Sequence, residues 1–198
     1  MQKKTSIFIL LVLIIASLLI GCGLGLKVTR VTVQSFEIQE SEAEKESAIN
    51  SITNILVDRG FDVKMSNKEA GIVTTEYKKF ASVGDNPPFD FYMQIKATVR
   101  PKAGKLLVKL SPVVKEQNRL NVAAFTEHEL SYFTGDPKTI RHLKSMDPET
   151  GWRAQAMTMF NNVVSEVAKT FGLTFDDVIQ NVTKTPEMIS LTTDLSKF

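Results

Sequence analysis

The sequence predicts an α+β domain: a single antiparallel sheet of about five to six strands, with two main helices packed on one face. Apolar and polar residues alternate across residues 89–99, which is typical of a strand with one buried and one solvated face. Residues 48–56 and 152–171 carry apolar side chains at helical spacing. Because a one-sided sheet needs a cover, these two helices are expected on its apolar face.

The expected elements begin with a strand over residues 28–38, where Val31 and Val33 alternate with polar residues. Ser41 and Glu44 have the spacing of a capping box and predict the start of the first helix, and Gly60 has the place of its C-terminal glycine. These signals predict one strand followed by one helix.

Four further strands are expected in the middle of the chain. Residues 61–65 and 72–80 predict a strand pair around a turn. The strand over residues 89–99 is expected to return through a loop at residues 101–104 into a strand beginning near Leu106.

The last third of the chain predicts a final strand and the main helix. Residues 127–133 are a possible strand, and residues 138–144 a short helical turn. Asp147 and Pro148 are typical of a helix start, and the long helix that follows is expected to end at Gly172. A short helix at Thr174 would complete a folded domain over residues 27–182, and residues 183–198 are expected to be a polar C-terminal tail.

The N-terminus has the features of a secretory signal peptide over residues 1–21. Lys3 and Lys4 precede an apolar run over residues 7–20, which is short for a membrane-spanning helix. The ending Leu19-Ile20-Gly21-Cys22 resembles the bacterial lipobox. That resemblance implies cleavage between Gly21 and Cys22, a diacylglycerol thioether on Cys22, and a short tether over residues 22–26. The alternative is an uncleaved membrane anchor.

The lipobox resemblance also implies a location. Acyl chains on Cys22 would hold the protein durably on a membrane. Gly23 stands after the cysteine, which by the enterobacterial sorting rule implies the outer membrane, facing the periplasm, if the host has two membranes.

The composition is that of a globular protein and excludes some classes of function. Without Lys3 and Lys4, 22 basic residues balance 22 acidic residues, so net charge gives no support for nucleic-acid binding. Cys22 is the only cysteine, which excludes a disulfide framework.

Residues 48–77 resemble the helix-grip domains of the C lipoprotein of the outer-membrane β-barrel assembly machinery. The resemblance lies in an amphipathic helix, then Arg59-Gly60-Phe61-Asp62-Val63, a turn, and Gly71-Ile72-Val73-Thr74-Thr75-Glu76-Tyr77. It implies a helix-grip-like fold for this chain.

Catalytic chemistry is not indicated. In Glu127-His128-Glu129, alternation along a strand would place His128 on the face opposite both acids, which does not converge three ligands on a metal. His142 lies in a basic segment. Because neither a Gly-x-Ser-x-Gly elbow nor a phosphate-binding glycine loop is present, we expect no enzyme activity, no metal and no cofactor.

The solvated face of the expected hairpin is strongly basic. The expected register sets Arg100 opposite Lys105 and Lys96 opposite Lys109, and like charges opposed across a ladder are destabilising. These four residues are therefore the candidate contact face for an anionic partner.

The sequence thus predicts a lipid-anchored, non-enzymatic module that binds an envelope protein with an acidic surface, or acts in an assembly or scaffold. The alternative is a carrier of a lipid or small ligand, with an apolar cavity between helices and sheet. The two differ in structure, because a carrier keeps a sizeable apolar pocket. The sequence does not determine the oligomeric state.

Overall fold

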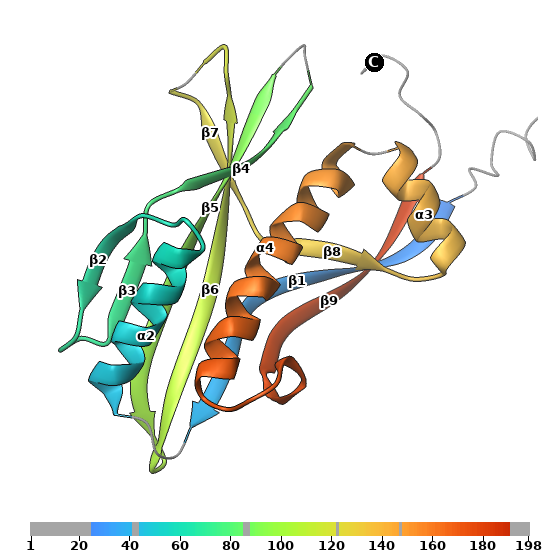
Figure 1. Ribbon diagram of the computed structural model, residues 1–198. Coiled ribbons are helices and arrows are strands. Elements are labelled where there is room, and N and C mark those ends of the chain that lie inside the picture. Colours follow the sequence, from blue (N-terminus) through green and yellow to red (C-terminus); the bar gives the residue numbers. More distant parts are fainter. Residues whose placement is uncertain (1–24, 41–43, 85–87, 122, 147, 191–198) are drawn as a thin grey trace, which may run out of the picture.

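The computed structural model describes residues 25–40, 44–84, 88–121, 123–146 and 148–190. Within them, one antiparallel sheet carries its helices on one side (Figure 1). The strands are β1 (Gly25–Glu40), β2 (Val63–Asn67), β3 (Ile72–Thr75), β4 (Lys78–Val83), β5 (Phe89–Lys102), β6 (Lys105–Asn118), β7 (Phe125–His128), β8 (Ser131–Thr134) and β9 (Ile179–Ser190). The helices are α2 (Lys45–Asp58), α3 (Pro137–Met146), α4 (Pro148–Thr170) and the 3-10 turn η1 (Phe175–Asp177).

The strands run in the order β2-β3-β5-β6-β1-β8. Along β5, β3 and β4 pair with successive stretches of the strand, and along β6 the same is true of β1 and β7. The strand β9 pairs with β1 along most of its length. The long strand β1 therefore joins two parts of the sheet. Its second half pairs with β6, and its first half lies between β8 and β9.

The core lies between the sheet and the helices α2 and α4. From α2 it receives Ile49, Ile52 and Leu56, all 0% exposed, because their spacing puts them on one face of the helix. The long helix α4 contributes a stripe that begins with Trp152 and Phe160, and Trp152 stacks on Phe91 of β5 with ring centroids 4.6 Å apart. These contacts fix α4 across the middle of the sheet (Figure 1).

The predicted sheet of five to six strands under two main helices is wrong, because the described residues form nine strands and three α-helices. Two segments that each suggested one strand are divided. Residues 72–80 form β3 and β4, and the segment around His128 forms β7 and β8. The first break leaves the partner unchanged, because β3 and β4 both pair with β5 and differ only by a shift in register. At the second break the partner changes, since β7 pairs with β6 and β8 pairs with β1.

The largest single difference lies at the C-terminus. Residues 183–190, expected in a polar tail, form most of β9, which pairs with β1 from Gly25↔Ser190 to Glu37↔Ile179. An edge strand gains backbone hydrogen bonds whatever its side chains, so a polar segment can fill this place without an apolar pattern. Residues 191–198 lie outside the described residues.

The hairpin register also differs from the expected one. Ala103 and Gly104 both have positive φ, at 51° and 77°, and form a two-residue turn in place of the four-residue loop expected at residues 101–104. The strands therefore extend to Lys102 and Lys105, which face each other. This shifts every pair by two residues, so Val99 pairs with Val108 rather than with Leu106.

Candidate ligand-binding cavity

A partly open cavity of about 440 Å³ lies between the first half of α4 and the strands β1, β8 and β9. Its lining is mostly aromatic and aliphatic, with three polar side chains. The lining residues are Phe36, Tyr132, Phe133, Ile140, Arg153, Ala154, Met157, Asn161, Phe175 and Gln180. This is where a cavity between helices and sheet was expected for a carrier.

The helical wall of the cavity is a second stripe on α4, next to the core stripe. Arg153, Met157 and Asn161 follow one another four residues apart, so they lie on one line along the helix. Trp152 and Phe160, one position earlier in each turn, are buried in the core at 1% and 0% exposure. The core contacts therefore hold the cavity wall in place.

The opposite wall comes from three strands and η1. Phe36 is 1% exposed, and its ring lies 5.4 Å from that of Phe160 and 5.7 Å from that of Phe175. Gln180 pairs with Phe36 across β9 and β1, so both project onto the same face. The Asp177 carboxylate caps η1 by accepting bonds of 2.7 Å from the Thr174 hydroxyl and 2.8 Å from the Thr174 backbone N–H. The hydroxyl first, and then the backbone N–H, hold the pKa of Asp177 below its ordinary value.

Two polar side chains in the cavity are largely shielded from solvent. Arg153 is 9% exposed, donates to the Ser131 hydroxyl at 2.7 Å, and lies over the Trp152 ring at 4.4 Å. The Asn161 side-chain oxygen is buried and has no hydrogen-bond partner among the described residues. A shielded acceptor without a donor is uncommon in folded proteins, because its lost hydration is not replaced. Asn161, which lines the cavity, is therefore the candidate polar contact for a ligand.

The segment Glu127-His128-Glu129 is divided between the two faces of the sheet. His128 Nε2 lies 2.8 Å from Glu116 Oε2 on the helix side, and its ring is 5.7 Å from Trp152. Glu127 accepts a bond of 3.1 Å from the Tyr77 hydroxyl. Burial and then this contact raise the pKa of Tyr77 to about 12. Among the described residues, no three His, Cys, Asp or Glu side chains gather as a metal site, and the His142 side chain lies outside the described part.

The four basic residues of the predicted contact face lie on the sheet face away from the helices, but they do not oppose one another. Lys96 pairs with Ser111, Arg100 with Leu107 and Lys109 with Thr98. Lys105 faces Lys102 at the hairpin end. The predicted like-charge pairs are thus wrong, because the two-residue turn changes the register. None of the four makes an ion pair with a described residue.

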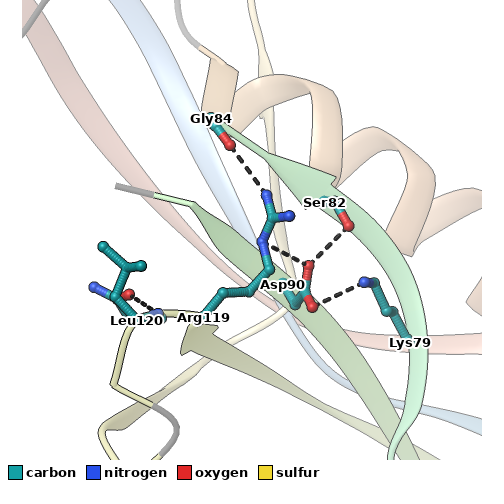
Figure 2. Close-up of polar contacts among 7 residues, drawn as sticks. Lys79, Ser82, Gly84, Asp90, Arg119 and Leu120 are labelled. Carbon is teal, nitrogen blue, oxygen red and sulfur yellow. Dashed lines mark hydrogen bonds and ion pairs between the residues drawn. The ribbon is translucent and has the colours of Figure 1, made fainter. Parts of the chain in front are cut away.

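A polar cluster that no sequence pattern indicated surrounds Asp90 (Figure 2). Its carboxylate lies 2.8 Å from Lys79 Nζ and from the Ser82 hydroxyl, and 3.5 Å from Arg119 Nε. Burial raises the pKa of Asp90, but the contacts with Lys79 and Ser82 outweigh it and hold that pKa below its ordinary value. Arg119 also donates to the Gly84 carbonyl at 3.2 Å, so the cluster ties the β4–β5 and β6–β7 connections together.

The predicted lipidation and cleavage residues, Gly21 and Cys22, lie outside the described residues. In the part of the chain that the structure describes, no helix combines the length and the apolar character needed to cross a membrane.

The fold and the cavity together define a single-sheet antiparallel domain with an apolar cleft beside its long helix. No family model and no curated protein matches the sequence, so the resemblance to helix-grip domains stays a prediction.

Solved structures similar to this chain include two bacterial proteins. One is a DUF4468 family protein from Bacteroides ovatus, with 17% identity, 71% of this chain and 85% of that chain covered, and a TM-score of 0.42. The other is a TBP-like protein from Parabacteroides distasonis, with 12% identity, 71% and 92% covered, and a TM-score of 0.42. The function is therefore argued from the residues of this chain.

Proposed function

We propose that this protein is a membrane-tethered, non-enzymatic module that binds a small, largely apolar ligand in the cavity beside α4. The cavity carries the proposal, because its volume of about 440 Å³ and its aromatic lining are typical of small-molecule sites. The described titratable side chains that line it are Arg153 and Tyr132. Arginine stays protonated in proteins, so this pair favours binding over acid–base catalysis.

Asn161 determines which polar group the ligand must carry, namely a hydrogen-bond donor. A ligand that donates one hydrogen bond to the Asn161 oxygen restores the interaction that this atom lacks in the free protein. The rest of the ligand would lie against the apolar side chains of the lining, among them Met157 of α4 and Phe175 of η1. The expected ligand is therefore an amphipathic molecule with an apolar body and a hydroxyl, amine or amide N–H.

The tether in this proposal is the acylated Cys22. The lipobox-like ending at Gly21 and Cys22 supports it, and the described strand β1 begins at Gly25, three positions after the cysteine. Attachment to the periplasmic side of an outer membrane, in a host with two membranes, would place the cavity beside a supply of lipids and other apolar molecules.

Native mass spectrometry of the acylated protein tests the cavity. A medium-chain alcohol should bind, and its methyl ether, which has no donor, should bind about tenfold or more weakly because the Asn161 oxygen then stays unpaired. Asn161→Leu should abolish this preference. Met157→Trp should fill the cavity and remove binding of both probes, whereas Thr158→Trp, on the exposed neighbouring position of α4, should not. Equal binding of alcohol by the Met157 and Thr158 variants would show that the cavity is not the site.

A second candidate function, protein binding, is favoured by the basic sheet face, defined as Lys96, Arg100, Lys105 and Lys109. These cations have no acidic partner among the described residues, and all but the partly buried Lys109 are exposed. An envelope protein with an acidic surface would supply the missing charges. In-cell crosslinking should capture one protein with the wild type and lose it with Lys96→Glu/Lys109→Glu. A captured protein that is unaffected by this variant would exclude the basic sheet face as its contact.

A further inference from the structure

The chain enters the fold at the end of the molecule that also carries α3. The strand β1 begins there, and its first residues pair with the last residues of β9, from Gly25↔Ser190 onward. Gly135, just before α3, packs against the backbone of Lys27 and Val28. Figure 1 shows α3 beside the beginning of β1, whereas the β5–β6 hairpin lies at the opposite end.

Three exposed cations are concentrated at this end: Lys27 on β1, and Lys138 and Arg141 on α3. We call them the tether-end surface. None of the three makes an ion pair with a described residue. Grooves on the two sides of Gly135 are lined by Arg141 and by Lys27, which places both cations around the same short connection.

The acidic groups near the tether-end surface are already engaged. The Asp136 carboxylate accepts bonds of 3.0 Å from the Thr139 backbone N–H and 3.2 Å from its hydroxyl. The Glu187 carboxylate lies 2.9 Å from Arg30 Nε. Glu187 is balanced by Arg30, and Asp136 keeps its charge against the three cations, so the described charges at this end are still net positive.

We propose that the tether-end surface rests on the anionic phospholipid headgroups of the membrane that holds the protein. Two residues lie between Cys22 and Gly25, so the Cα atoms of Cys22 and Gly25 are about 10 Å apart at most, and an acylated cysteine keeps this end at the bilayer. Anionic headgroups attract each basic side chain near the surface, but the charge of Asp136 opposes one of the three, so together they favour the docked orientation roughly thirtyfold. The proposal rests on the acylation of Cys22 but not on ligand binding in the cavity.

Docking in this orientation has a consequence for the ligand. Phe133 and Ile140 line both the cavity and the groove beside Arg141. The cavity therefore adjoins the membrane-facing side, and an apolar ligand would pass between bilayer and cavity without crossing the solvated face of the sheet. The basic hairpin residues would point away from this membrane.

Fluorescence quenching in vesicles tests the orientation. The acylated protein, purified from membranes, is labelled at Thr134→Cys near α3 or at Ser66→Cys on exposed β2; Cys22 does not react, because its sulfur is in the thioether. Vesicles contain a headgroup-quencher lipid in phosphatidylcholine, with or without phosphatidylglycerol. The tether alone should make quenching somewhat stronger at residue 134 than at residue 66, and phosphatidylglycerol should increase this difference several-fold. High salt should reduce the difference.

A pair of charge reversals supplies the matched control. Lys138→Glu/Arg141→Glu should remove the extra quenching at residue 134, whereas Lys105→Glu/Lys109→Glu, an equal change of charge at the far end, should leave it. Equal quenching at both labels, or quenching independent of phosphatidylglycerol and of the Lys138/Arg141 reversal, would overturn the proposal. A protein that is not incorporated into vesicles would overturn it together with the tether, while alcohol binding by the cavity would still be measured separately.

Discussion

Replacing Asp90 by asparagine should lower the free energy of unfolding by about 2 kcal/mol at neutral pH. The carboxylate is 10% exposed and lies 2.8 Å from Lys79 Nζ and 3.5 Å from Arg119 Nε. A hydrogen bond between charged groups contributes about 1.5–3 kcal/mol when shielded, but both cations are nearly half exposed and regain hydration when released. We therefore expect about 1–2 kcal/mol from Lys79 and less than 1 from Arg119.

The effect of Asp90→Asn on the free energy of unfolding should also depend on pH. Because the pKa of Asp90 is held below its ordinary value in the folded protein, its charge stabilises the fold fully above the unfolded value of about 3.9. This contribution is lost as the pH falls through the lower, folded value. The difference between wild type and Asp90→Asn should therefore shrink in acid below about pH 4.

Urea titration followed by tryptophan fluorescence measures both effects, because Trp152 is the only tryptophan and stacks on Phe91, next to Asp90 in β5. Lys79→Met should cost about 1 kcal/mol alone and nothing further in the Asp90→Asn background. Equal stability of wild type and Asp90→Asn at neutral pH, or a difference that does not change with pH, would refute the assigned role of the cluster.

Three further outcomes are expected. Gly71→Ala should destabilise by about 3 kcal/mol in the same titration, because φ is 70° and a Cβ would lie 2.0 Å from the Val99 carbonyl oxygen; a change within error would be inconsistent with this close approach. In an alkaline absorbance titration, the phenol of Tyr77, assigned with Tyr77→Phe, should ionise near pH 12. Glu127→Gln should lower that pKa without restoring the ordinary value, because burial is the larger cause. Cys22→Ser should prevent acylation, and mass spectrometry of an unmodified Cys22 in the wild type would contradict the tether.

Local signals in the sequence predicted the positions of individual elements better than they predicted how the strands pair in the sheet. Gly60 ends α2 with a φ of 75°, and Thr174 and Asp177 form the expected capping contacts. Each of these features is decided within a few residues. The pairing of β9 with β1 is not, because it joins residues about 150 positions apart through backbone bonds that side-chain patterns do not report.

The cavity illustrates the same limit. The sequence indicated α4 from its apolar stripe, but Arg153, Met157 and Asn161 were indistinguishable from an ordinary solvated face. These three residues line a cavity because η1 and β9 place Phe175 and Gln180 on its other side. That arrangement depends on the tertiary fold and not on the sequence of α4. The regular four-residue spacing beside the core stripe was present in the sequence, yet it does not by itself separate a cavity wall from a surface.

The position of the cavity follows from the division of the sheet. The strand β1 pairs with β6 from Phe36 onward and with β8 over Thr29 to Thr32, and its pairing with β9 shifts register between Val33 and Ser35. One straight helix cannot pack closely on both parts of a sheet that bends at such a bulge. The helix α4 packs its core stripe, from Trp152 through Phe160, on the part of the sheet that contains β5 and β6. The space therefore remains beside the neighbouring stripe of its first half, which faces β1, β8 and β9. An enlarged cavity should therefore result from Phe36→Leu, at the bend, more than from substitutions along β5.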